Sequence, residues 1–157
     1  MCNRVGDNIK VLLLVLALVV GGRCYATTNP LIGSWKWDNH KTLQHFKMPA
    51  RGSNQLMESA KKAKRFVMGT ASKLRSNMVL IYRDEKCAEV IYDNSGHELS
   101  RKWVPYRVVK ITKEYVVIDQ FENGGVVKIY LDGDDSSYVP VRVGEFVYRD
   151  YFTRIGK

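Results

Sequence analysis

The sequence predicts a mainly β protein whose consecutive antiparallel strands form a meander barrel. After residue 76 the chain consists of short apolar runs, rich in β-branched and aromatic residues, separated by turn sequences. No βαβ alternation interrupts these runs, so neighbouring runs are expected to pair as hairpins. One short helix is expected earlier, inserted after the first strand.

The first 26 residues have the features of a secretory signal peptide. Arg4 and Lys10 precede an apolar run at residues 11–22, and small residues follow it. This run has twelve residues, whereas a membrane-spanning helix needs roughly 20. An uncleaved membrane anchor is the alternative. We therefore expect an exported protein, periplasmic or secreted, in which residues 27–157 form a single domain.

The site of signal cleavage determines which cysteines remain. Cleavage after Ala26 would leave Cys87 alone, and we expect a buried, inert thiol there. Cleavage after Gly22 would keep Cys24 and permit a Cys24–Cys87 disulfide, which an exported compartment favours. We favour the later cleavage site.

The first strand is expected at the sequence GSWKW, where alternation places Gly33, Trp35 and Trp37 on one face. A barrel that closes its last strand beside its first needs a large side chain at the closed end. Gly33 would allow close approach of the backbone next to such a side chain. Arg154, in the last apolar run, is placed to stack on Trp35 and to bond to carbonyl groups of the chain ends.

A helix is expected over residues 54–65, before the remaining strands. Leu56, Ala60, Ala63 and Val67 recur at helical spacing, and Ser53 can cap the N-terminus.

Positive charge is concentrated in residues 36–75. This segment has ten basic residues against Asp38 and Glu58, whereas residues 76–157 are close to neutral. Such asymmetry indicates an anionic partner, for which an acidic protein or an anionic lipid surface fits an exported chain better than nucleic acid. A solvated helix face is the alternative. The candidate patch consists of Lys61, Lys62, Lys64, Arg65, Lys73 and Arg75.

Seven further strands are expected from the apolar runs that follow. They are residues 77–82, 87–92, 102–112, 115–121, 126–131, 138–143 and 145–155. Alternation is visible within them, since Val127, Ile129 and Leu131 share one face of their run.

The Gly33-Ser34-Trp35 triplet, the antiparallel runs after it and Arg154 near the end resemble the small bacterial lipocalin-like (calycin-type) β-barrels. The resemblance implies that Trp35 packs at the barrel base under Arg154, so that Gly33, Trp35 and Arg154 form a structural lock. The early helix departs from typical lipocalins, in which the helix follows the barrel. A barrel of eight strands holds one small ligand or is filled with side chains.

No catalytic or metal-binding constellation is recognisable. His40, His45 and His97 lack the spacing that would align two of them on a helix face. The turn DGDDSS, residues 132–137, lacks the glycine and distal glutamate of a calcium loop. Neither a nucleophile elbow nor a cysteine-protease context is present. We expect no cofactor, no metal and no enzymatic activity; an enzyme that uses scattered polar residues is a third hypothesis.

The leading hypothesis is non-enzymatic binding of a small apolar or amphipathic molecule inside a monomeric barrel. The candidate lining residues are Trp37, Tyr82, Tyr92, Tyr106, Tyr130 and Tyr148. On the outer face the same tyrosines would form cross-strand pairs, and a one-residue bulge exchanges the two faces. The alternative is an envelope inhibitor or immunity-type module that docks residues 36–75 into an acidic cleft.

Overall fold

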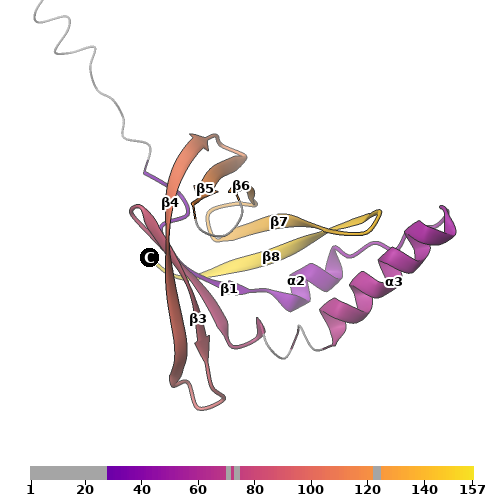
Figure 1. Cartoon of the computed structure of the whole chain (residues 1–157), viewed down its shortest axis with the longest axis horizontal. Helices are drawn as coiled ribbons and strands as arrows, with labels where there is room; N and C mark the ends of the chain where they lie inside the picture. Colours follow the sequence, from indigo (N-terminus) through magenta and orange to yellow (C-terminus); the bar gives the residue numbers. More distant parts are fainter. Residues whose placement is uncertain (1–27, 70–71, 73–74, 122–124) are drawn as a thin grey trace, which may run out of the picture.

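The first strand pairs with both the second and the last strand, so the sheet closes on itself. The computed structural model describes residues 28–69, 72, 75–121 and 125–157. Eight antiparallel strands follow one another in chain order around a closed barrel (Figure 1). The predicted meander barrel is therefore confirmed. The expected signal peptide, with Cys24, lies outside the described residues.

All seven runs predicted after the helix are strands. The strands are β1 (Gly33–Trp37), β2 (Met78–Arg83), β3 (Lys86–Tyr92), β4 (Glu98–Ile111), β5 (Tyr115–Gln120), β6 (Gly125–Leu131), β7 (Ser136–Val143) and β8 (Phe146–Gly156). Barrel closure is seen at Trp35, which pairs with Leu80 on β2 and with Arg154 on β8.

Among the described residues, the helices with defined bounds between β1 and β2 are two, rather than the one predicted. The first, α2 (Asn39–Gln44), begins where the Asp38 carboxylate accepts a hydrogen bond of 2.8 Å from the Lys41 main-chain N–H. Thr42 is its one fully buried side chain. Six residues with a single buried position have no apolar periodicity, which is why the sequence pattern did not indicate this helix.

The second helix, α3 (Asn54–Met68), is the one predicted, and it continues three residues beyond the expected end. Ser53 caps it, since the Ser53 hydroxyl accepts from the Leu56 main-chain N–H at 3.0 Å. Ala60, Ala63 and Val67 are fully buried, as their spacing predicts. They belong to the same core as the aromatic side chains of β8.

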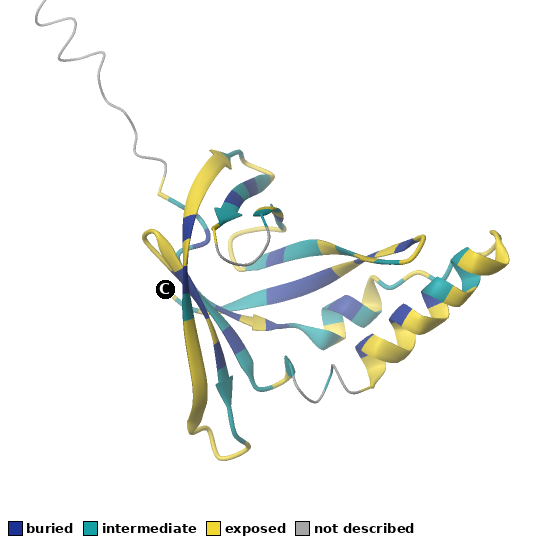
Figure 2. Cartoon of the chain, in the orientation of Figure 1, coloured by how far each residue is buried: buried dark blue, intermediate teal, exposed yellow. Residues whose placement is uncertain are grey.

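Side chains fill the closed end of the barrel. The void left among them has a volume of about 40 Å³, little more than one water molecule occupies. Its lining comes from β1, β2, β6, β7, β8 and the segment before β1: Leu31, Trp35, Leu80, Tyr82, Ile129, Ser137, Val139 and Phe152. Figure 2 shows that β4, in contrast, is exposed along most of its length. The closed end of the barrel is thus packed with side chains.

The barrel is most weakly closed between β6 and β7. Among the described residues, these strands share two cross-strand pairs, Tyr130–Tyr138 and Leu131–Ser137. In contrast, β7 pairs with β8 along its whole length, from Ser136 to Val143. Beyond Tyr138, β7 runs away from β6 (Figure 1), so the barrel widens on this flank.

Candidate functional site

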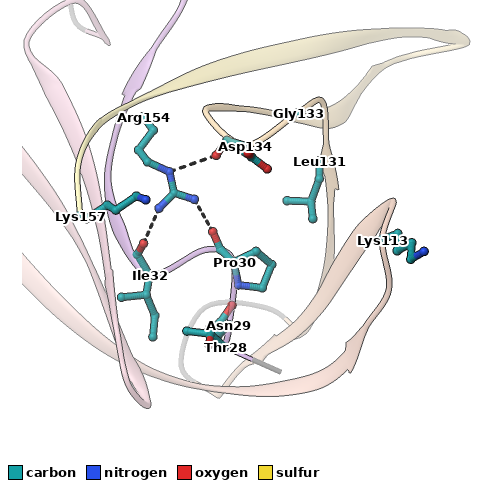
Figure 3. Close-up of a pocket in the computed structure, with 10 residues that line it drawn as sticks. All are labelled: Thr28, Asn29, Pro30, Ile32, Lys113, Leu131, Gly133, Asp134, Arg154 and Lys157. Carbon is teal, nitrogen blue, oxygen red and sulfur yellow. Dashed lines mark hydrogen bonds between the residues drawn. The ribbon is translucent and has the colours of Figure 1, made fainter. Parts of the chain in front are cut away.

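Arg154 ties the closed end of the barrel together. Its guanidinium lies over the Trp35 ring, with 4.4 Å between Cζ and the ring centroid, which is the stacking that the sequence predicts. The same group donates to the main-chain carbonyl groups of Ile32 at 2.7 Å and Pro30 at 2.5 Å (Figure 3). A third donation, of 3.2 Å, goes to the carbonyl group of Asp134 in the β6–β7 turn. Arg154 therefore joins β8 to two other segments.

Gly33 allows this closure because its backbone passes very close to the end of β8. A Cβ atom at Gly33 would lie 2.5 Å from the Gly156 carbonyl oxygen, and the φ angle of Gly33 is +134°. Both features favour glycine at this position. Beside it, the Trp35 indole N–H donates to the Leu31 carbonyl oxygen at 2.7 Å, so the buried tryptophan has its polar atom satisfied.

A wide depression of about 450 Å³ lies outside this closed end (Figure 3). Ten residues line it: Thr28, Asn29, Pro30, Ile32, Lys113, Leu131, Gly133, Asp134, Arg154 and Lys157. Arg154, the residue at its base, already donates to three main-chain carbonyl groups. Because its hydrogen bonds go to the main chain, the Arg154 guanidinium stabilises the fold. The depression is therefore a weaker candidate for a ligand site than the cavity described next.

A cavity of about 240 Å³ opens on the inner face of β2, β3 and β4. The register of these strands creates it, because Tyr82 pairs with Cys87, which in turn pairs with Val104. Alternate residues of three neighbouring strands therefore share one face. The cavity is lined by Leu80, Tyr82, Cys87, Ala88, Glu89, Ser100, Lys102, Val104 and Gln120. Tyr82, Cys87 and Val104 are buried, whereas Glu89, Ser100 and Lys102 are exposed, so the floor is apolar and the mouth is polar.

Tyr82 and Leu80 each line both this cavity and the small void at the closed end, so the two spaces adjoin. Burial raises the pKa of the Tyr82 hydroxyl above its ordinary value. The Tyr82 ring meets the Tyr106 ring edge-on, with centroids 5.8 Å apart. Tyr82 is thus held in a fixed position at the base of the cavity.

Tyr106 lies deeper and does not line the cavity. Its hydroxyl donates to the Arg83 carbonyl oxygen and accepts from the Asn29 side-chain amide, both at 2.8 Å. Burial raises the pKa of Tyr106 to about 12, although the hydrogen bond from Asn29 lowers this pKa in part. Because both hydrogen bonds are internal, this tyrosine is a core residue.

Cys87 has the buried thiol that the sequence predicts, and it is free among the described residues. The Gln120 side-chain amide donates to its Sγ atom at 3.6 Å. Burial raises the pKa of the Cys87 thiol, and the Gln120 hydrogen bond lowers it in part.

Trp37 lies beside an ion pair that the sequence did not reveal. Its indole N–H donates to the Asp150 carboxylate at 2.5 Å, and the other oxygen of that carboxylate pairs with Arg75. Asp150 is 3% exposed. An acidic residue in a strand is normally taken to face solvent, but Asp150 shares the inward alternation of Tyr148 and Phe152. That alternation was the one sequence feature from which the burial of Asp150 could have been predicted.

The remaining candidate tyrosines do not line the cavity. Tyr148 is buried against Phe46, with ring centroids 5.5 Å apart, and burial raises its pKa. Its hydroxyl has no hydrogen-bond partner among the described residues. Tyr92 is half-buried near the end of β3 and is absent from the cavity wall. Of the six candidate lining residues, the structure therefore brings one, Tyr82, to the cavity.

Tyr130 lies on the outer face of the barrel, in a row of tyrosines that crosses four strands. The register aligns Tyr115, Tyr130, Tyr138 and Tyr151 side by side on β5 to β8. The rings of Tyr130 and Tyr138 stack in parallel with centroids 4.9 Å apart. The Lys128 ammonium lies 3.8 Å from the Tyr115 centroid and 4.6 Å from the Tyr130 centroid. This is the cross-strand pairing that the sequence left open for the tyrosines.

The predicted basic patch is divided in the structure. Lys61, Lys62, Lys64 and Arg65 are exposed on α3. Arg75 is half-buried, because it pairs with Asp150 and lies over the ring of Trp37; it therefore does not extend the patch. Lys73 lies outside the described residues.

The described residues include no group of three or more His, Cys, Asp or Glu side chains that could hold a metal ion. His40 is exposed, and His97 is exposed beside Asp93. His45 packs on the Tyr151 ring, with centroids 4.8 Å apart. No helix within the described ranges is both long enough and apolar enough to cross a membrane.

No protein-family model matches the chain, and no curated protein or solved structure is significantly similar to it. The strand topology alone establishes the fold as an eight-stranded antiparallel meander barrel.

Proposed function

We propose that this protein binds a small amphipathic molecule, without transforming it, in the cavity on the inner face of β2, β3 and β4. The observation that carries the proposal is the cavity itself, which has an apolar floor and a polar mouth. Concave sites with mainly apolar walls and a few polar groups are the usual form of small-molecule sites. Its volume of about 240 Å³ suits a compact ligand.

The mouth of the cavity suits a ligand with a polar head group. Glu89 and Lys102 are cross-strand partners, so opposite charges lie side by side at the entrance. Ser100 and Gln120 add a hydroxyl and an amide that both donate and accept hydrogen bonds. A ligand that inserts a short apolar part toward Leu80 and leaves a zwitterionic or hydrogen-bonding head at the mouth would satisfy both regions.

The proposal includes membership of the lipocalin-like barrels and export directed by residues 1–26. Support for the first comes from the closed meander and from the Arg154 guanidinium over Trp35. Because the closed end is filled with side chains, the bound molecule would lie toward Glu89 and Lys102, the exposed side of the cavity. The binding needs no metal and no cofactor.

Native mass spectrometry of the protein purified from its own host tests the proposal, together with titration of the dye anilinonaphthalene sulfonate. We expect an added small-molecule mass that survives desalting and that the dye displaces. Ser100→Trp should fill the mouth, remove the added mass and weaken dye binding about tenfold or more. Leu99→Trp is the matched control, because Leu99 neighbours Ser100 and is 67% exposed. A bare mass, with equal dye binding in both variants, would overturn the proposal.

A further inference from the structure

We infer that the exposed side of α3 is a docking surface for an anionic lipid bilayer. This inference goes beyond the ligand-binding proposal and does not depend on it. The surface, named here the α3 face, consists of Lys61, Lys62, Lys64, Arg65 and Met68.

The barrel holds α3 in a fixed rotation about its axis. Ala60, Ala63 and Val67 are fully buried, so the opposite side of the helix must face solvent. Next to Ala60, Ser59 lies against Gly144 in the β7–β8 turn. A Cβ atom added at Gly144 would be 2.4 Å from the Ser59 hydroxyl oxygen. The Ser53 hydroxyl also donates to Glu145 at 2.9 Å. The α3 face is therefore presented by a helix anchored to the barrel (Figure 2).

The charge of the α3 face is almost uncompensated. Lys61 pairs with Glu58 at 2.9 Å, but the two side chains are 56% and 66% exposed, so water screens this pair strongly. Lys62, Lys64 and Arg65 form no ion pair with any described residue. Cations held near an anionic membrane each strengthen binding about fivefold.

An exposed apolar side chain among the cations favours a lipid surface over an acidic protein. Met68 is 60% exposed. Met68 lines a broad depression of about 540 Å³ together with Lys61, Lys64 and Arg65. At a bilayer surface, apolar side chains enter the boundary between head groups and acyl chains while Lys and Arg remain at the phosphates. The α3 face offers both kinds of side chain within two helical turns.

Vesicle binding by the full chain, as purified from its host, tests the inference. We expect binding to vesicles of phosphatidylglycerol and phosphatidylcholine that weakens as salt is raised, and much weaker binding to phosphatidylcholine alone. Neutralising three cations, as K61Q/K64Q/R65Q, should reduce partition to the anionic vesicles on the order of 100-fold. The dye affinity of the inner cavity should not change.

A control variant, K86Q/K110Q/R142Q, removes the same charge from exposed positions on β3, β4 and β7. It should change partition by less than about threefold, because these cations do not adjoin the apolar side chains of α3. As a second readout, Met68→Trp should shift its emission to the blue on anionic vesicles and be quenched by brominated acyl chains. Equal binding to both vesicle types, or unchanged partition of the α3 variant, would overturn the inference. Charge-dependent capture of an acidic protein without vesicle binding would also overturn it.

Discussion

The Arg154 guanidinium stacks on the Trp35 ring at 4.4 Å, and the two residues are cross-strand partners on β8 and β1, the strands that close the barrel. Arg154 also donates to three carbonyl groups, so its side chain joins β8 to the segment before β1 and to the β6–β7 turn. A flexible ammonium cannot reproduce this set of directed donors.

We therefore expect Arg154→Lys to lower the free energy of unfolding by about 2–3 kcal/mol, because main-chain carbonyl groups at the closed end lose their donors. Urea denaturation of the variant and the parent protein measures this loss. Arg149→Lys is the control, since Arg149 is exposed and its guanidinium lies over Tyr138; a change of about 0.5 kcal/mol or less is expected there. Equal losses in the two variants would show that the carbonyl contacts of Arg154 contribute little.

Replacing either tryptophan of β1 by alanine should cost about 3–5 kcal/mol, as for other buried large aromatic residues. The sequence predicts a smaller loss for Trp37→Ala if Trp37 lies in an open cavity. In the structure Trp37 is 5% exposed and bonds to Asp150, so we now expect losses of similar size. Thermal and urea unfolding of both variants measure them. A loss near zero for Trp37→Ala would indicate that its indole is not part of the packed core.

Stability should fall at alkaline pH because of the buried tyrosines. Burial raises the pKa of Tyr106 from 10.0 to about 12 and also raises that of Tyr82. The unfolded chain ionises these hydroxyls from about pH 10, whereas the folded protein keeps them neutral. The stabilisation is therefore complete below pH 10 and is lost as the pH rises toward the folded pKa, by about 1.4 kcal/mol per pH unit for each tyrosine.

Tyr82→Phe should remove the share of this slope that belongs to Tyr82, about 1.4 kcal/mol per pH unit above pH 10. Urea midpoints measured from about pH 9 to 12 determine the slope. Phe152→Leu, which changes a buried side chain without a titratable group, is the control and should keep the parent slope. If Tyr82→Phe also kept that slope, the Tyr82 hydroxyl would not be desolvated in the folded protein.

The Cys87 thiol should react slowly with iodoacetamide in the folded protein, because the thiolate is the nucleophile and burial raises the thiol pKa. Alkylation at neutral pH should be about tenfold slower, or more, than in urea. Gln120→Leu should slow it further, since the Gln120 amide lowers this pKa. Timed alkylation with peptide mapping follows the Cys87 peptide directly. Rapid native alkylation would contradict the burial of Sγ.

The strands and α3 were predictable because they depend on local patterns. Alternation of β-branched and aromatic residues identified the strands, and the spacing of Gly33 and Trp35 in the first strand indicated a packed end near Arg154. The helical spacing of Ala60, Ala63 and Val67 identified α3 for the same reason. The strand and helix signals each lie within a few neighbouring residues of the chain, whereas the contact of Arg154 with Trp35 was expected from the resemblance to lipocalin-like barrels.

The wall of the cavity depends on register, which one sequence does not reveal. The pairing of β4 with β5 shifts between Val108 and Lys110, and such a bulge changes which residues face inward. Tyr106 and Tyr130 look alike in the sequence, yet one is a core residue and the other lies on the outer face. The pairing of Asp150 with Arg75 joins residues far apart in the chain, so no local pattern predicts it.

The divergence of β7 from β6 has a consequence for how copies of this chain behave in a crowded solution. An open strand edge is a template on which other chains polymerise. The Ser136 carbonyl oxygen accepts a hydrogen bond from the Asp132 N–H, so the main-chain groups of Ser136 point toward β6. Every second residue of a strand directs its main-chain groups to the same side, so those of Pro140 and Arg142 also point toward β6. Proline offers no N–H group to an incoming strand, and the charged arginine next along that edge opposes stacking of identical copies. Pro140 and Arg142 therefore disfavour fibril growth from this edge of β7.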